Sequence, residues 1–197
     1  MNLVLASTSK TRSALLAAAG VAHESADPAF DEAPLRTELE RKGEPPAGIA
    51  RALARAKAAV LTSSRPGQVI IGADQVLTLN GSLFAKPSSL AEAENQLRTL
   101  RGRRHVLISA AVLVRDGQIL SEPCAEAQLT MRDFSDAFLS DYLRTEAEAV
   151  LGSVGCYHLE GRGAQLFAAI DGDYFTVLGL PLIALLASLR ELGMLQS

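Results

Sequence analysis

The stretch VIIGADQVL, Val69 to Leu77, is an apolar run with one acid in its interior, Asp74. A short apolar run of this kind predicts a buried strand. Gly72 and Ala73 precede the acid, and such small residues let a ligand approach the backbone. A carboxylate held there can bind a divalent cation or accept a proton from water. The alternative interpretation is a structural carboxylate at a strand end.

The segment before this strand predicts a helix from Ile49 to Leu61, and Lys57 is its most informative residue. At about 3.6 residues per turn, Lys57 falls in the middle of an apolar stripe, whereas Arg51 and Arg55 fall on the opposite face. The stripe contains Ile49, Ala50, Leu53, Ala54, Val60 and Leu61. A lysine on the core side needs a partner or a wet cleft, because an unpaired buried charge is costly. A snorkelling lysine is the alternative, and the central position disfavours it.

The N-terminal segment predicts a strand over Asn2 to Ala6, a polar turn, and a helix that ends near Gly20. The turn, ASTSKTR, places Ser7, Ser9, Arg12 and free backbone N–H groups at a helix start, where phosphate groups bind. Ordinary N-capping explains Ser9 equally well. The GxxxxGK[ST] pattern of a Walker loop is absent.

Turn signals and apolar runs predict the remaining elements. Residues 22–48 are polar and contain prolines, so we expect them to be loop-rich. Asp31 and Glu32 lie there and are a weak signal by themselves, because paired acids in a polar loop are usually solvated. Asn80-Gly81 predicts a hairpin that folds Lys86 back towards the Asp74 strand. A second hairpin turn is predicted at Asp116-Gly117, and strands are predicted at Val106–Val114, Ala164–Ile170 and Tyr174–Leu178. Three further helices are predicted. One begins with a Ser89/Glu92 capping box and ends near Leu100, one covers Ser135–Arg144, and the last begins with Pro181 at its N1 position. This mixture favours an α/β class with a mixed sheet in a single domain over residues 1–197.

Composition excludes several classes of protein. Hydrophobic residues make up 48% of the 197 residues, enough for a sizeable core. The net charge is -3 and no long basic block is present, which disfavours a nucleic-acid surface. The longest apolar run, near Leu178 to Leu189, is too short to span a membrane, and the N-terminus has no signal-peptide pattern. We therefore expect a cytoplasmic protein in which Cys124 and Cys156 are reduced.

The residues that carry chemistry are two or three cations, two or three acids and a phosphate-like turn. The histidines are scattered, and no HExxH or serine–histidine motif is present. This combination points to metal-assisted chemistry on a phosphorylated substrate.

Six motifs, taken in order, resemble signatures of the Maf family. ASTSKTR resembles ASxSxxR, FDE its acidic pair, ARAKA its lysine motif, GADQV its aspartate strand and KP its second lysine. GCYHLEGRGAQLFAAIDGDYFTVLGLPL resembles its long C-terminal signature. The matches extend from Leu3 to about Leu189 and so cover nearly the whole chain.

The resemblance implies an α/β fold of the Maf and ITPase-like kind: an elongated mixed sheet flanked by helices, with a central cleft between two lobes. It also implies a nucleoside triphosphate pyrophosphatase that forms a monophosphate and pyrophosphate, uses Mg²⁺ or Mn²⁺, and is often a homodimer. By position, Glu32 and Asp74 would handle metal and water, with Asp74 as the base. Phosphates would be held by Ser7, Arg12, Lys57 and Lys86, and Ser9 belongs to the same substrate-binding turn.

Two positions bear on the nucleobase. Gln75 stands where the pyrimidine-preferring branch of the family has Thr, and Glu160 where that branch has Gln. The pair resembles the branch that prefers 7-methyl-GTP, although that branch has an aromatic residue in place of Thr11. A carboxylate at position 160 favours a cationic base such as N7-methylguanine. The alternatives are a dTTP or UTP pyrophosphatase, and a nucleotide-binding regulator of cell division without catalysis.

Overall fold

The computed structural model describes residues 3–147 and 149–196. Its strands are β1 (Leu3–Ala6), β2 (Glu24–Ala26), β3 (Val69–Leu79), β4 (Ser82–Phe84), β5 (Arg104–Arg115), β6 (Gln118–Ser121), β7 (Cys124–Met131) and β8 (Phe167–Asp171). Its α-helices are α1 (Lys10–Ala18), α2 (Glu32–Arg41), α3 (Pro46–Thr62), α4 (Leu90–Leu100), α5 (Asp136–Glu146), α6 (Tyr174–Val177) and α7 (Leu182–Glu191). Two 3₁₀ turns are η1 (Ala149–Gly152) and η2 (Arg162–Leu166).

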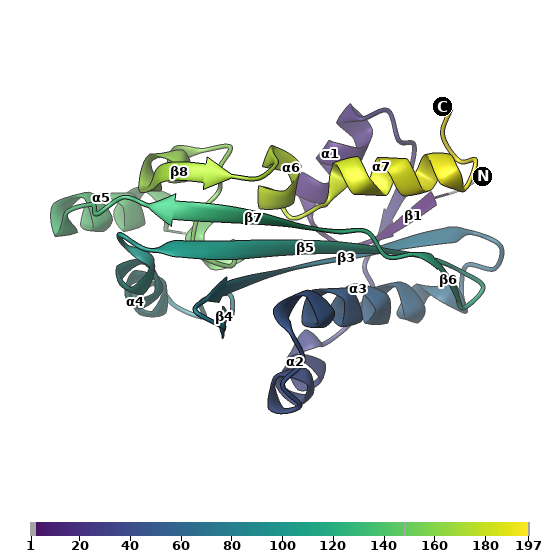
Figure 1. The fold of residues 1–197 in the computed structure, drawn as a ribbon, viewed down its shortest axis with the longest axis horizontal. Helices are drawn as coiled ribbons and strands as arrows, with labels where there is room; N and C mark the ends of the chain where they lie inside the picture. Colours follow the sequence, from purple (N-terminus) through teal and green to yellow (C-terminus); the bar gives the residue numbers. More distant parts are fainter. Residues whose placement is uncertain (1–2, 148, 197) are drawn as a thin grey trace. The chain divides into compact units, whose positions relative to one another are not determined.

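Within the described residues, the strands form one eight-stranded sheet in the order β2-β1-β3-β5-β7-β8, with β4 on β3 and β6 on β5 (Figure 1). β1 is parallel to both β2 and β3, whereas the β3–β4, β5–β6 and β7–β8 pairs are antiparallel. The predicted α/β class with a mixed sheet flanked by helices is therefore confirmed. The cleft implied by the resemblance stays a prediction.

The chain separates into two compact units, and the long strands β3 and β5 contribute residues to both. The first unit contains the described residues up to 75, residues 108–125, and the described residues from 174 onward. The second contains residues 76–107 and the described part of 126–173. The single-domain assignment stays a prediction.

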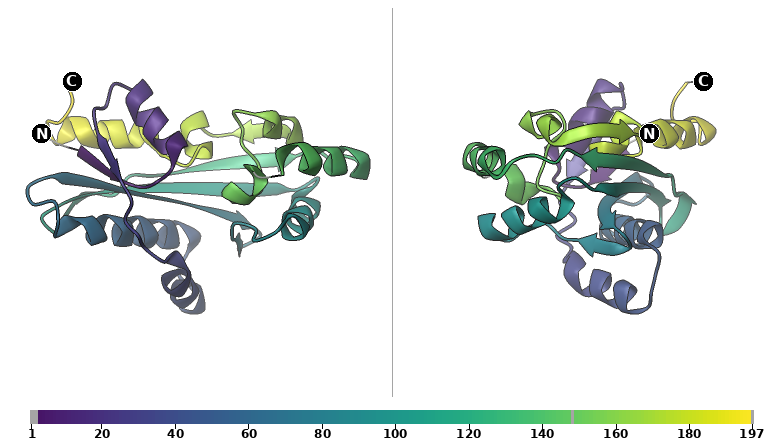
Figure 2. Two further views of the ribbon diagram at one scale, coloured as in Figure 1. Left: turned by 180° about the vertical axis from the view of Figure 1, so that it is seen from behind. Right: turned by 60° about the vertical axis from the view of Figure 1, so that its left-hand side comes forward.

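In the first unit, α1 and α7 cover one face of the sheet and α3 covers the other (Figure 1, Figure 2). The core under α1 and α7 contains Leu3, Leu5, Leu16, Val21, Val69, Ile71, Ala73, Ala111, Leu113, Leu180, Leu182, Leu185 and Leu189. Side chains alternate between the faces of a strand. Because Ile71 and Ala73 belong to this core, Gly72 and Asp74 face α3 instead.

The two hairpin turns were predicted correctly. Asn80 and Gly81 have φ values of 52° and 86°, and Asp116 and Gly117 have 49° and 81°. A turn with both central residues at positive φ matches the right-handed twist of the two strands it joins. The Ser89 cap is also confirmed, since its hydroxyl accepts a hydrogen bond from the Glu92 amide. The Glu92 carboxylate, however, accepts from the Ser88 amide, so the reciprocal half of the predicted capping box is displaced by one residue.

Residues 22–48 are more regular than expected, because they contain β2 and the ten-residue helix α2. The Asp31 carboxylate caps α2 by accepting from the Ala33 amide, and Pro34 lies in the first turn, where no backbone donor is needed. No residue of α2 is fully buried, so the helix lacks the apolar stripe by which sequence analysis finds helices.

Three further expectations near the C-terminus were wrong in detail. The predicted strand at Tyr174–Leu178 is the short helix α6, and Gly179, with a φ of 96°, follows it. The strand expected from residue 164 begins only at Phe167, after η2. Pro181 is the N-cap of α7 and not its first helical residue. Short apolar runs fit a strand or a buried helical turn equally well, which explains the first of these errors.

The second unit contains a buried histidine, His105, that is fully inaccessible to solvent. Its Nε2 atom lies 2.8 Å from the Tyr157 hydroxyl, and the rings of Tyr157 and Phe167 pack against it. Its Nδ1 atom is buried with no hydrogen-bond partner among the described residues. Burial lowers the pKa of His105 to about 4 from its ordinary 6.5, because the charged imidazolium would be poorly solvated there.

This histidine should make folding sensitive to acid. The unfolded chain takes up the proton first, so the stability due to neutral His105 is complete above about pH 6.5 and falls as the pH drops towards 4. The loss should be on the order of 3 kcal/mol. Between pH 7 and pH 4, the free energy of unfolding measured in urea should fall less in His105→Gln than in wild type. In His158→Gln the decrease due to His105 should remain. An equal loss in wild type and His105→Gln would contradict the assignment.

Candidate active site

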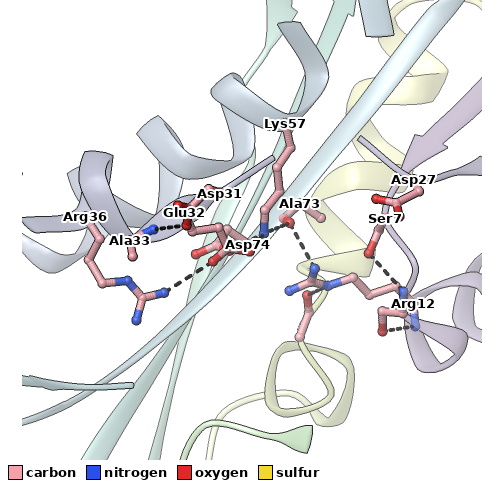
Figure 3. A network of polar contacts seen from close by, with 12 residues as sticks. Ser7, Arg12, Asp27, Asp31, Glu32, Ala33, Arg36, Lys57, Ala73 and Asp74 are labelled. Atoms are coloured by element: carbon pink, nitrogen blue, oxygen red, sulfur yellow. Dashed lines mark hydrogen bonds and ion pairs between the residues drawn. The ribbon is translucent and has the colours of Figure 1, made fainter. Parts of the chain in front are cut away.

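Lys57 is the centre of a buried polar network in the first unit (Figure 3). Its side chain extends from α3, and the residue is only 7% exposed. The ammonium nitrogen lies 2.6 Å from Oδ1 of Asp74 and 2.7 Å from Oε1 of Glu32. The snorkelling interpretation is therefore wrong. The first four residues of the predicted stripe are buried, whereas Leu61 is partly buried and Val60 is 44% exposed.

The close packing of α3 on β3 brings this lysine to the acids. Gly72 faces the helix, and a Cβ atom built on it would lie 1.9 Å from the backbone oxygen of Ala54 and 3.0 Å from the Cβ of Ala58. Only glycine allows the helix backbone this close. Lys57 follows Ala54 by three residues and Asp74 follows Gly72 by two, so the same contact carries both side chains to one place.

Asp74 lies in the interior of β3, and its residue is only 3% exposed. Oδ1 pairs with Lys57, whereas Oδ2 is buried and has no hydrogen-bond partner among the described residues. Burial raises the pKa of Asp74, although the positive charges of Lys57 and Arg12 oppose the shift. A buried carboxylate oxygen without a partner is costly, and a ligand or a metal ion would satisfy it. The alternative of a structural acid at a strand end does not fit this placement.

Glu32, the first residue of α2, is a second acid of the network and not a simply solvated one. Its Oε1 atom contacts Lys57, and its Oε2 atom lies 3.4 Å from the guanidinium of Arg36. Its side chain is 36% exposed, so it connects the buried pair to solvent. Arg36 was missed by the sequence analysis. Its four-residue spacing from Glu32 on one helix was the available indication.

Arg12 extends from α1 to two backbone carbonyl groups. Its Nε atom donates to the oxygen of Gly179 at 2.8 Å, and its Nη1 atom donates to the oxygen of Ala73 at 2.9 Å. Burial lowers the pKa of Arg12, while the negative charges of Asp74 and Glu32 oppose the shift. The predicted contact of Arg12 with phosphate stays a prediction. In this structure its guanidinium links β3 to the segment after α6.

The serines of the first turn shape the start of α1. Ser9 is its N-cap, as predicted, and accepts a hydrogen bond from the Arg12 amide. The buried Ser7 hydroxyl accepts from the Ser9 amide. The first N–H groups of a helix have no acceptor within the helix, so this turn keeps donors for an anion.

Gln75 lies on the opposite face of β3 from Asp74. Its Nε2 atom donates to the Ser109 hydroxyl at 3.1 Å and to the backbone oxygens of Thr176 and Val177 at 2.9 and 3.1 Å. The Ser109 hydroxyl in turn donates to the oxygen of Thr176 at 2.8 Å. These contacts tie β3 and β5 to α6.

Comparison with known proteins assigns the chain to a family. A family model described as Maf-like protein matches residues 2–192. The chain belongs to the Maf family. This match confirms the family that the motifs of the sequence resemble, over nearly the whole chain.

Similar relatives in the Maf family carry enzyme names. The chain is 46% identical over 191 residues to a protein of Rhizobium etli named 7-methyl-GTP pyrophosphatase, covering 97% of this chain and 96% of the relative. It is 45% identical over 195 residues to a nucleoside triphosphate pyrophosphatase of Sphingopyxis alaskensis, covering 98% of each. A nucleoside triphosphate pyrophosphatase of Caulobacter vibrioides is 48% identical over 193 residues, with 98% and 96% covered.

Two predicted site residues of this Maf-family chain lie in the second unit. Lys86 follows β4 and is exposed, and Glu160 is exposed between η1 and η2. As predicted, the hairpin returns the chain along β3, with Phe84 opposite Leu77. The contribution of Lys86 and Glu160 to the site stays a prediction. The other predicted site residues all belong to the first unit: Ser7, Ser9, Arg12, Glu32, Lys57, Asp74 and Gln75.

The acids of the site fit a metal ion that a substrate helps to bind. Among the described residues, no group of three or more His, Cys, Asp or Glu side chains could hold a metal by itself. Glu32 and Asp74 share Lys57 as a neighbour, and Asp74 Oδ2 lacks a partner among the residues described. Mg²⁺ in proteins is commonly held by one or two carboxylates together with substrate phosphates.

The contact at Gly72 can be tested by adding one methyl group. Gly72→Ala should lower the free energy of unfolding by about 1–3 kcal/mol, because the helix backbone must move away from β3. Nucleotide hydrolysis should fall as well, since Lys57 moves with the helix. Urea unfolding and steady-state kinetics measure the two effects. Gly152→Ala is the matched control, because its Cβ would meet no atom within 4 Å. Wild-type stability and kinetics in Gly72→Ala would show that the contact is not needed.

Proposed function

We propose that the chain is a nucleoside triphosphate pyrophosphatase, a hydrolase that converts NTP and water to NMP and pyrophosphate. The observation that carries the proposal is the buried cluster in which Lys57 joins Glu32 to Asp74 while Asp74 Oδ2 stays without a partner among the described residues. The names of the Maf-family relatives support the same reaction. A binding protein without catalysis has no need of a buried acid that lacks a partner, which disfavours the regulator hypothesis.

Asp74 is the proposed general base. Burial raises its pKa, so its carboxylate is a stronger base than a solvated aspartate and accepts a proton from the attacking water more readily. Lys57 neutralises charge that develops on the phosphates. The same role for Lys86 stays what the family resemblance implies. Glu32 and Asp74 would hold Mg²⁺ or Mn²⁺, which supplies further charge neutralisation at the phosphates.

We further propose 7-methyl-GTP as a preferred substrate. The Rhizobium etli relative carries that name, and Glu160 supplies a carboxylate that favours a cationic base. Thr11, in the first turn of α1, cannot stack on a purine as an aromatic residue would. A preference for dTTP or UTP is the alternative with the same chemistry.

A cytoplasmic location and a homodimer also stay predictions. No helix of the described residues is long and apolar enough to cross a membrane.

Asp74→Asn tests the reaction centre. The substitution keeps the shape of the side chain but removes the base, so kcat for pyrophosphate release should fall by about 10²- to 10⁴-fold while the protein stays folded. Pyrophosphate release from a panel of canonical and modified nucleotides, with Mg²⁺ and with Mn²⁺, measures the effect. Asp133→Asn removes a carboxylate that is 92% exposed and should keep wild-type kcat. Near-wild-type turnover in Asp74→Asn would remove this residue from the mechanism.

Glu160→Gln tests the nucleobase. Wild type should have a higher kcat/KM for 7-methyl-GTP than for UTP or dTTP, and the variant should shift the ratio towards the pyrimidines. The physical reason is that an amide offers both a donor and an acceptor to the mixed edge of uracil or thymine, whereas a carboxylate only accepts. A wild-type kcat/KM that is higher for UTP or dTTP would refute the 7-methyl-GTP assignment and leave the general reaction intact.

A further inference from the structure

The helix α2 carries two ion pairs between residues four apart, and the two pairs differ in their surroundings. Both side chains of the Glu38–Lys42 pair are more than half exposed. In the Glu32–Arg36 pair the arginine side chain is only 19% exposed, although α2 has no fully buried residue. An exposed ion pair on a helix contributes little to stability. The covered position of Arg36 is therefore a property that pairing along the helix does not explain.

Arg36 extends from α2 towards the acids of the buried network (Figure 3). Its guanidinium has five N–H donors in a planar fork. The part of the chain that the structure describes gives it one polar partner, Oε2 of Glu32. The 3.4 Å between this oxygen and Nη2 is long for a hydrogen bond. Most donors of this largely covered side chain thus have no acceptor within the described residues.

The acids of the network have another cation besides Arg36. The ammonium of Lys57 lies 2.7 Å from an oxygen of Glu32 and 2.6 Å from an oxygen of Asp74. A metal ion held by Glu32 would compete with Arg36 for the same carboxylate. The fork of a guanidinium matches two oxygens of a phosphate group as well as it matches a carboxylate. With metal and nucleotide bound, the acceptor that suits Arg36 is therefore a phosphate oxygen.

The position of Arg36 complements the first turn of α1. Figure 3 shows Arg36 to the left of the Asp74 carboxylate and Ser7 and Arg12 to its right. All four residues belong to the first unit. The first turn keeps backbone donors for an anion, so groups that bind phosphate lie on both sides of the buried acid. A polyphosphate chain that passes over Asp74 would contact both.

We propose that Arg36 binds a phosphate group of the nucleotide, on the side of Asp74 away from the first turn of α1. The proposal rests on the proposed function, because it names a further substrate contact in the same site. The competing interpretation is that Arg36 only holds Glu32 in place for a metal ion. The two interpretations differ in whether Arg36 acts on the phosphate itself or through the acid.

The test measures binding of the two products, which requires no turnover. Arg36→Met removes the guanidinium but keeps a long flexible side chain, and Arg36→Lys keeps the charge without the fork. Arg41→Met is the matched control, since Arg41 is exposed in the last turn of the same helix. NMR titrations with inorganic pyrophosphate, 7-methyl-GMP and UMP give each Kd at limiting and at saturating Mg²⁺. Steady-state kinetics and urea unfolding are measured on the same variants.

In Arg36→Met we expect the Kd of pyrophosphate or of both monophosphates to rise about tenfold or more at either Mg²⁺ concentration, because a charge-assisted contact with phosphate is lost. We expect kcat/KM for the nucleoside triphosphates to fall by at least the same factor. Arg36→Lys should recover part of the loss, and Arg41→Met should match wild type. The urea midpoint of Arg36→Met should stay close to that of wild type, since this partly exposed ion pair contributes little to folding.

Two results would overturn the phosphate contact. One is binding of all three products by Arg36→Met with wild-type Kd. The other is a loss of affinity that disappears at saturating Mg²⁺, which is the result expected if Arg36 only holds Glu32 for the metal. If Arg36→Met does not fold, Arg36→Gln is measured in its place. Failure of wild type to release pyrophosphate from any nucleotide would contradict the proposed function, and the product Kd values would still decide whether Arg36 binds phosphate.

Discussion

The close approach of α3 to β3 at Gly72 is the constraint on which the site depends. With no side chain at this position, the backbone of Ala54 comes so close that a single Cβ atom would lie 1.9 Å away. Lys57 then lies over Asp74, and its ammonium nitrogen lies between two carboxylates at 2.6 and 2.7 Å. If α3 lay farther from β3 by even the diameter of a methyl group, Lys57 and Asp74 would be buried without forming their ion pair, which would cost stability. The missing side chain of Gly72 therefore determines both the packing of α3 on β3 and the pairing of Lys57 with the two acids.

The described residues leave one buried acceptor of this cluster without a hydrogen bond, the Oδ2 atom of Asp74. Burial dominates the pKa of Asp74 and raises it, although Lys57 and Arg12 are near enough to oppose the shift. One of its oxygens has no partner among the described residues, and Glu32 is partly open to solvent. Groups arranged in this way cost stability in the absence of a ligand. A cation and an anionic phosphate would supply the missing partners together. This unmet acceptor supports the proposal of a nucleotide bound together with a metal ion.

The periodicity of the sequence revealed the buried charges of Lys57 and Asp74 but not most of the groups that surround them. Lys57 and Asp74 interrupt apolar patterns, so each is visible in its own segment. Glu32 was a weak signal by itself, because paired acids in a polar loop are usually solvated, and only the family resemblance pointed to it. The helix α2 that carries it has no buried residue and so no apolar stripe that would have shown its orientation. The contacts of Arg12 and Gln75 were not predictable, because their acceptors are backbone carbonyl groups at Ala73, Thr176, Val177 and Gly179. Every residue has such a group, so the sequence does not mark the ones that are used. The place of Arg12 at a helix start, together with the family resemblance, gave it a phosphate-binding role, whereas Gln75 received its substrate role from the resemblance alone.

The motif GADQV shows why residues of one signature need not share one task. Side chains alternate along β3, so Gly72 and Asp74 face α3 whereas Ala73 and Gln75 face the side of α6 and α7. Gly72 admits the helix, and Asp74 meets its lysine. Ala73 belongs to the hydrophobic core, and its backbone oxygen receives Arg12. Gln75 joins the strand to the carbonyl groups behind it. The proposed reaction requires Asp74 on one face of β3, and the contacts on the other face keep the strand in position. A change from Gln to Thr at position 75 would therefore alter the anchoring of β3, because the shorter side chain loses the bonds to the Thr176 and Val177 oxygens.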